Sequence, residues 1–146
     1  MKYRVEHVRY INGEGVSYTE TIDNTDEQLT EDQLLDGYID FCREHDWLKL
    51  VDNETDEVVA TTEDIDIVFW LDYQENQVYG EQVVLYKKYG DRDTNLYDEQ
   101  EVFSAYFDDI QGLKEAMDEG DMIKAYELID ARIQQDLGYV PDYTVG

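Results

Sequence analysis

Cys42 and His45 have residue types that bind metals or act as nucleophiles, and they lie three positions apart on a segment with helical periodicity. This spacing is typical of half a zinc site, but His7 is the only other histidine in the chain. Catalysis by a Cys/His pair also needs a third group to orient the histidine, and the sequence indicates none. Because Cys42 falls on the apolar side of the segment, we expect it to be a buried core residue.

Two acidic segments have part of the spacing of a calcium-binding loop. Segment 91–95 matches the first three ligand positions, but Leu96 stands where the sharp turn needs glycine. Segment 52–63 places acids at ligand positions one, three, five and twelve, but Glu57 stands at the glycine position. Neither segment predicts a specific calcium site, so cation binding is kept only as a less favoured function class.

The chain contains 37 Asp and Glu residues, and this abundance means that no single acid–base pair stands out. The sequence has no glycine-rich phosphate loop and no Gly-x-Ser-x-Gly motif. We therefore expect a protein that is not an enzyme and that has no cofactor and no metal site.

The formal net charge of −26 is the most unusual property of the chain. It disfavours anionic membranes and nucleic acid as direct partners, because both would be repelled, and favours basic proteins, cations or high salt. The segments 10–42, 51–86 and 93–113 contain neither Lys nor Arg. A hydrophobic content of 42% is too high for a disordered acidic tail, so we expect a folded protein with an acidic surface.

Length and cysteine content predict one acidic domain over residues 1–146, in the cytoplasm. A single cysteine excludes an internal disulfide and fits a reducing compartment. The N-terminal residues alternate between polar and apolar types, which is not a signal-peptide pattern. The longest apolar run, 67–71, is far shorter than a membrane span.

The N-terminal half predicts two hairpins and one helix. Strands are expected at 2–11 and 16–22 around a turn at 12–15, and a second hairpin pairs 48–51 with 57–62. Between them, a helix should begin after Thr30 and end near His45. Its start is indicated by a capping box of Thr30 with Gln33 and a hydrophobic staple of Leu29 with Leu34.

The C-terminal half predicts one more strand pair and two helices. The strands are expected at 65–71 and 78–89, with a turn at 74–76 and a loop at 90–95. A capping box of Asp98 with Glu101 predicts a helix that runs to about Met117. Asp121 then caps a last helix, whose expected buried side is Met122, Ala125, Tyr126, Ile129 and Ile133. The order ββαββββαα predicts a single-domain α+β protein with a mostly antiparallel sheet, one helix in the middle and a C-terminal helix pair.

Acidic residues recur at regular spacing on the expected elements. Asp32, Asp36 and Asp40 repeat every four residues, so a helix would place them about 6 Å apart on one face. Asp64, Asp66 and Asp72 would share one face of the strand that follows. A 146-residue globule is about 38 Å across, and duplex DNA carries about 22 charges over that length. The charge of this chain is therefore comparable to that of an equal length of DNA.

High acid content, few bases, abundant tyrosine and small size resemble the DNA-mimic inhibitors of phages and mobile elements, which include anti-restriction and anti-CRISPR proteins. The resemblance covers the composition of the whole chain and no motif. It implies a non-enzymatic inhibitor in the cytoplasm of a bacterial host, whose acidic surface blocks the nucleic-acid-binding channel of a restriction or CRISPR effector. Such proteins share no single fold, so the resemblance carries over no residue.

The expected partner is a basic nucleic-acid-binding protein, contacted by acids on three parts of the chain. The candidate contact residues are Asp32, Asp36, Asp40, Glu54, Asp56, Glu57, Glu63, Asp64 and Asp66, with a second set of Asp108, Asp109, Glu115 and Asp118. Whether a homodimer extends the acidic surface is left open.

Three alternatives remain open at this stage. An immunity or antitoxin-like protein would neutralise one basic toxin through a focused acidic patch with aromatic anchors. A cation-binding protein is the second alternative. Salt adaptation is the third, but the chain has only five alanines and more Lys than Arg, unlike typical halophilic proteins.

Overall fold

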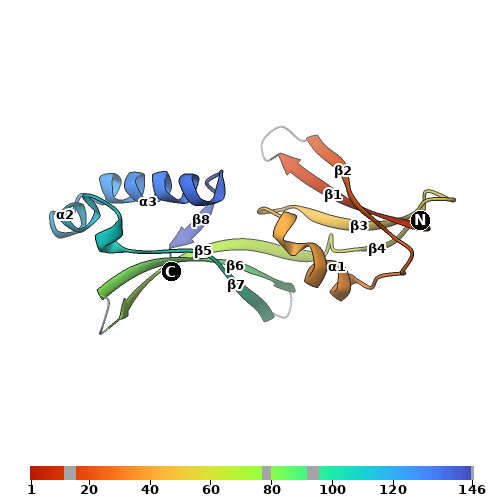
Figure 1. Cartoon of the computed structure of the whole chain (residues 1–146), viewed down its shortest axis with the longest axis horizontal. Coiled ribbons are helices and arrows are strands. Elements are labelled where there is room, and N and C mark those ends of the chain that lie inside the picture. Colours follow the sequence, from red (N-terminus) through yellow and green to blue (C-terminus); the bar gives the residue numbers. More distant parts are fainter. Residues whose placement is uncertain (12–15, 77–79, 92–95, 146) are drawn as a thin grey trace. The chain divides into compact units, whose positions relative to one another are not determined.

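The computed structural model describes residues 1–11, 16–76, 80–91 and 96–145, and the chain divides into two compact units (Figure 1). Unit 1 contains Met1–Val68 and Tyr89–Asp98, and unit 2 contains Phe69–Lys88 and Glu99–Gly146. The expected α+β class is confirmed, with two mostly antiparallel sheets, a helix in the middle of the chain and a C-terminal helix pair.

The sheet of unit 1 has four antiparallel strands in the order β2-β1-β3-β4. They are β1 (Tyr3–Ile11), β2 (Val16–Thr25), β3 (Trp47–Asp52) and β4 (Val58–Thr61). Both predicted hairpins are therefore confirmed, while the turn expected at 12–15 lies outside the described residues. The β1–β2 pairing shifts register between Val5 and Glu6.

The two faces of this sheet differ in their side chains. Val5 pairs with Leu50, and both are buried in the core of unit 1. Because side chains alternate along a strand, Arg4, Glu6 and its partner Lys49 lie on the opposite face. The two cationic side chains Arg4 and Lys49 thus lie on the side of the sheet that does not face this core.

The helix α1 (Glu31–Tyr38) packs on the core side, and its predicted capping box is present. The Gln33 backbone N–H donates to Thr30 Oγ1 (3.3 Å), and the Thr30 backbone N–H donates to Gln33 Oε1 (2.9 Å). The expected end near His45 is wrong, because the chain leaves α-helical geometry at Tyr38, with φ −132°, and forms the 3-10 helix η1 (Ile39–Phe41). His45 itself has φ 66°, which an α-helix does not allow.

The core of unit 1 is closed by residues from α1, η1 and the strands. Leu34 and Leu35 of α1, Ile39 of η1 and the following Cys42 are buried against Leu48 of β3. The prediction that Cys42 is a core residue is confirmed. This core holds α1 and η1 against the sheet, so their outward residues have defined positions.

The second sheet has the order β7-β6-β5-β8. Its strands are β5 (Ile65–Asn76), β6 (Gly80–Asp91), β7 (Leu96–Tyr106) and β8 (Tyr143–Val145). The β8 strand, which the sequence did not predict, pairs with β5 in parallel. The turn expected at 74–76 is wrong, because β5 continues to Asn76, and β6 includes Gly90 and Asp91 of the expected loop.

The helix expected from Asp98 is also wrong, because the chain forms strand β7 up to Tyr106 and then the 3-10 helix η2 (Phe107–Asp109). Phe103, Ala105 and Phe107 are buried, while Ser104 between them is exposed. This is a period of two, which packs one side of a strand into the core. Pairing with β6 prevailed over the capping-box pattern.

The C-terminal helices α2 (Leu113–Asp118) and α3 (Met122–Leu137) cover one face of the sheet in unit 2 (Figure 1). The predicted cap of α3 is confirmed, since the Lys124 backbone N–H donates to Asp121 Oδ1 (3.2 Å). Met122, expected to be buried, is exposed at the first position of the helix. The helices and the sheet bury a shared core that includes Phe69, Leu71, Leu85, Phe103, Leu113, Ala125, Ile129 and Ile133. No helix in the described parts of the chain has the length and apolar character needed to span a membrane.

Candidate acidic interface

Four carboxylates of unit 1 interact electrostatically near the start of α1. Burial first, and then the negative charges of Asp32, Asp64 and Asp91, raise the pKa of Glu31. These residues come from the first turn of α1, from the turn before β5, and from the last residue of β6. A raised carboxylate pKa means that the surroundings disfavour the charged form. The fold therefore gathers negative charge here from three separate segments.

A second group of acids acts electrostatically on Tyr89 of β6. Burial, and then the charges of Asp98, Asp36 and Asp40, raise the pKa of the Tyr89 hydroxyl. Asp36 belongs to α1, Asp40 to η1, and Asp98 to β7. Although Asp40 follows the end of the α-helix, its charge raises the pKa of the same tyrosine as the charge of Asp36 does. The phenol of Tyr89 stays neutral at physiological pH and lies among these charges.

The two groups together define the α1 acidic face, which consists of Glu31, Asp32, Asp36, Asp40, Asp64, Asp91 and Asp98. All of these are exposed except Glu31, which is partly buried. The segment from Tyr10 to Cys42, which supplies four of them, contains no Lys or Arg. Arg92, the base next to Asp91 in the sequence, lies outside the described residues.

Aromatic side chains lie beside this face. The Tyr38 hydroxyl donates to Asp23 Oδ2 (2.6 Å), and this hydrogen bond raises the pKa of Tyr38 to about 12 and lowers that of Asp23. The ring of Phe41 lies 6.5 Å from the ring of Tyr38 and is 51% exposed. An exposed Phe next to carboxylates gives this region an apolar contact as well as a charged one.

The hairpin acids Glu54, Asp56 and Glu57 are exposed in the turn between β3 and β4, but they do not belong to the α1 acidic face. Asp56 accepts a hydrogen bond from Arg4 Nη2 (3.0 Å) and has φ 60°. Asp52 caps the same turn by accepting from the backbone N–H groups of Glu54 (2.8 Å) and Thr55 (3.3 Å). These acids therefore have structural neighbours that organise the turn.

Of the acids expected on one strand face, Asp66 and Asp72 alternate with the buried Ile67, Phe69 and Leu71 on β5 as predicted, while Asp64 precedes the strand. Glu63 and Asp64 are exposed in the turn before β5, and only Asp66 and Asp72 belong to the strand. Asp66 is partly buried and accepts a hydrogen bond from the Tyr97 hydroxyl (3.2 Å). Asp72 belongs to unit 2, while the other acids belong to unit 1.

The second predicted set, Asp108, Asp109, Glu115 and Asp118, lies entirely in unit 2. Asp108 and Asp109 are exposed in η2, and Glu115 and Asp118 are exposed in α2. Arg132 Nη1 donates to the backbone carbonyl of Asp109 (3.1 Å), which attaches η2 to α3.

The residues that resembled metal ligands or nucleophiles are not brought together. Cys42 is buried while His45 is exposed, and His7 lies against Asp46, with 2.8 Å between Nε2 and Oδ2. Within the described ranges, no group of three or more His, Cys, Asp or Glu residues is placed to hold a metal ion. The calcium-like segment 91–95 falls mostly outside those ranges.

The sequence reasoning missed Glu31, Asp91 and Asp98 as members of the face. Glu31 adjoins Asp32 on the same helix, so the helical pattern itself carried the signal. Asp98 was interpreted as a helix cap, and only the β6–β7 strands place it beside α1 residues. No local pattern in the sequence links these two segments.

No family model matches the chain, and neither a curated protein nor a solved structure matches it. Any function must therefore be inferred from the residues and from their placement in the fold.

Proposed function

We propose that this protein is a non-enzymatic inhibitor whose acidic surface mimics the DNA phosphate backbone and blocks the nucleic-acid-binding channel of a bacterial defence protein. The target would be a restriction or CRISPR effector in the host cytoplasm. The observation that supports this proposal is the α1 acidic face, where separate segments contribute seven carboxylates. Lys and Arg side chains that bind phosphates pair with carboxylates by the same charge-assisted hydrogen bonds.

The clustering of these acids costs stability and therefore needs a reason. Like charges one helical turn apart destabilise a helix by roughly 0.2–0.5 kcal/mol per pair. The pKa of Glu31 is raised first by burial and then by repulsion from its acidic neighbours. Net charge alone keeps a protein soluble, so solubility does not require acids to be clustered in one region. A basic channel would remove the repulsion on binding and would steer association at rates up to about 10⁸–10⁹ M⁻¹s⁻¹ at low salt.

A second candidate function is an immunity or antitoxin-like protein that neutralises one basic toxin. The observation that favours it is Phe41, an exposed aromatic side chain beside the α1 acidic face. Aromatic anchors surrounded by polar residues are typical of focused protein interfaces. The two functions differ in whether acids outside this face also contribute to binding.

The proposal is tested by capturing the partner from bacterial lysate at low salt and eluting it with a salt step. The purified partner is then titrated with duplex DNA and with the protein, separately and together. Mimicry predicts mutually exclusive binding and an affinity that falls steeply as NaCl rises from 0.05 to 0.2 M. A ternary complex that keeps DNA at full affinity would refute it.

Two matched pairs of substitutions separate the candidate functions. Asp36→Asn with Asp40→Asn neutralises two acids of the α1 acidic face, and Asp108→Asn with Asp109→Asn removes the same charge from unit 2. Mimicry over an extended surface predicts that both pairs weaken binding, whereas an immunity protein loses affinity only with the first pair. Full affinity of both variants would show that the partner is bound through neither set of acids and would contradict both functions.

A further inference from the structure

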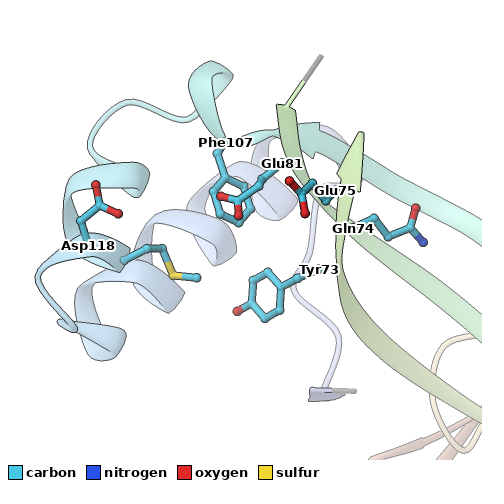
Figure 2. Close-up of a pocket in the computed structure, with 7 residues that line it drawn as sticks. Tyr73, Gln74, Glu75, Glu81, Phe107 and Asp118 are labelled. Atoms are coloured by element: carbon cyan, nitrogen blue, oxygen red, sulfur yellow. The ribbon is translucent and has the colours of Figure 1, made fainter. Parts of the chain in front are cut away.

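Unit 2 contains a pocket of about 280 Å³, and one of its lining residues, Asp118, belongs to the second predicted contact set (Figure 2). It is lined by Tyr73, Gln74, Glu75, Glu81, Phe107, Met117 and Asp118. Figure 2 shows the side chains of Glu75 and Glu81 coming from the sheet and that of Asp118 from the end of α2. The pocket thus lies between the β5–β6 strands and the first C-terminal helix.

Its inner wall is aromatic and held by the core of unit 2. Phe107 is only 5% exposed, and its ring meets that of Tyr73 edge-on, with 6.1 Å between the centroids and 87° between the planes. Burial and the neighbouring Tyr126 hydroxyl raise the pKa of Tyr73, so this wall carries no charge at physiological pH. Met117 packs against the same core and adds a polarisable sulfur.

The opening of the pocket is negatively charged. Glu75, Glu81 and Asp118 are exposed, and no Lys, Arg or His belongs to the described lining. These carboxylates would repel an anion, and a neutral apolar ligand would offer them no hydrogen bond or opposite charge. Among the described residues, these three carboxylates do not form a group that could hold a metal ion. The lining therefore favours an organic cation with a flat or apolar part.

We propose that this pocket binds the guanidinium side chain of an arginine presented by a partner protein. Guanidinium is planar, stacks on aromatic faces and donates paired hydrogen bonds to carboxylates, which matches both walls of the pocket. The volume lies just below the usual range of about 300–1,000 Å³ for ligand pockets, which suits a single side chain better than a larger cofactor. The inference deepens the proposed function, since a nucleic-acid channel presents arginines, but the pocket can be tested without the partner.

The test uses Nα-acetyl-arginine amide as the probe and Nα-acetyl-citrulline amide as its neutral analogue of nearly the same shape. Each is titrated into the whole chain at low salt, and chemical shifts are followed at the Tyr73 ring and the Met117 methyl group. We expect saturable shifts at these two residues with the arginine probe and at least tenfold weaker binding of the citrulline probe. Equal binding of the two probes, or shifts only elsewhere, would overturn the proposal.

Paired substitutions provide the control. Glu75→Gln with Glu81→Gln should weaken the arginine probe roughly two- to fivefold for each carboxylate, the range of exposed ion pairs. Glu101→Gln with Glu127→Gln removes the same charge at exposed positions that do not line the pocket, and should leave binding within the error of the titration. All four side chains are exposed, so the variants are expected to fold. An equal loss of affinity for the arginine probe in both variants would show that binding depends only on net charge, and would overturn the proposed site.

The outcome is distinct from that of the proposed function. If the arginine probe binds as described but the captured partner binds DNA and the protein together, the pocket stands and DNA mimicry fails. If DNA competition succeeds while the probe does not bind, mimicry stands and the pocket proposal fails. Calcium that displaces the arginine probe at equal concentration would show a metal preference and would also overturn the proposal.

Discussion

Replacing Asp46 by alanine should be among the most destabilising changes of a single acid in this chain. Asp46 is 2% exposed and lies between η1 and β3, where the chain passes from the α1 acidic face into the sheet. Its Oδ2 accepts the backbone N–H of Arg43 (2.9 Å) and lies 2.8 Å from His7 Nε2 on β1. The carboxylate therefore attaches the end of η1 to the sheet.

The size of the effect follows from what Asp46→Ala leaves behind. The Asp46 carboxylate is hydrogen-bonded to two largely buried groups, and a buried polar group left without its partner costs about 1–3 kcal/mol. The His7 side chain is 13% exposed, so some water can replace the lost oxygen. We therefore expect each of the two groups to cost about 1.5 kcal/mol, a total loss of about 3 kcal/mol in the free energy of unfolding.

Urea unfolding followed by tryptophan fluorescence measures this loss, since the chain has two Trp residues. With a slope of about 2 kcal/mol/M, the midpoint should fall by roughly 1.5 M. Asp36→Ala, an exposed acid on α1, is the matched control and should stay within about 0.5 kcal/mol of the parent chain. A double-mutant cycle with His7→Ala should give a coupling energy of at least about 1 kcal/mol. A loss below about 1 kcal/mol for Asp46→Ala, or no coupling to His7, would refute the reasoning.

Three further predictions concern α1 and its surroundings. Glu31→Gln should raise stability at pH 7 by roughly 0.5 kcal/mol, because it removes a charge that burial and then the neighbouring acids disfavour. The raised pKa of Glu31 means that the folded state binds this proton more tightly than the unfolded state does. The free energy of unfolding should therefore fall as pH rises from 4.5 through the raised pKa. Urea unfolding at several pH values should show that Glu31→Gln lacks this contribution. Thr30→Ala should cost about 1 kcal/mol through loss of the capping box, and an unchanged melting temperature would contradict it. Ultraviolet titration should find Tyr38 ionising near pH 12, and Asp23→Asn should bring it back toward 10; an unchanged titration would show that the Asp23 hydrogen bond does not control this phenol.

Local sequence signals predicted the elements that are stabilised by neighbouring residues. The capping box at Thr30, the cap at Asp121 and the hairpin pattern of β1 with β2 all involve contacts within a few residues or across one turn. Cys42 is buried as predicted, but it follows η1 in extended backbone and does not lie on the long helix that the periodicity indicated. The capping and hairpin signals are visible in the sequence because the interacting groups lie close together along it.

The same signals failed where pairing with a distant segment decided the structure. Asp98 and Glu101 have the spacing of a capping box, but pairing with β6 placed them in a strand. The β8 strand at 143–145 pairs with residues 69–71, more than seventy positions away, and three residues carry too little pattern to predict such a contact. The helix expected to reach His45 ended at Tyr38, followed by a 3-10 turn.

Composition and periodicity were enough to predict a strongly acidic α+β protein, because charge and the kinds of secondary structure can be read from neighbouring residues without any distant contact. Which acids interact with one another depends on how the strands and α1 pack together. Asp64, Asp91 and Asp98 join Asp32, Asp36 and Asp40 because β5, β6 and β7 bring them to α1, while the hairpin acids Glu54 and Glu57 stay outside the face. Electrostatic interaction depends on distance in space and is weakened by solvent, so it cannot be predicted until the strands that set those distances are placed.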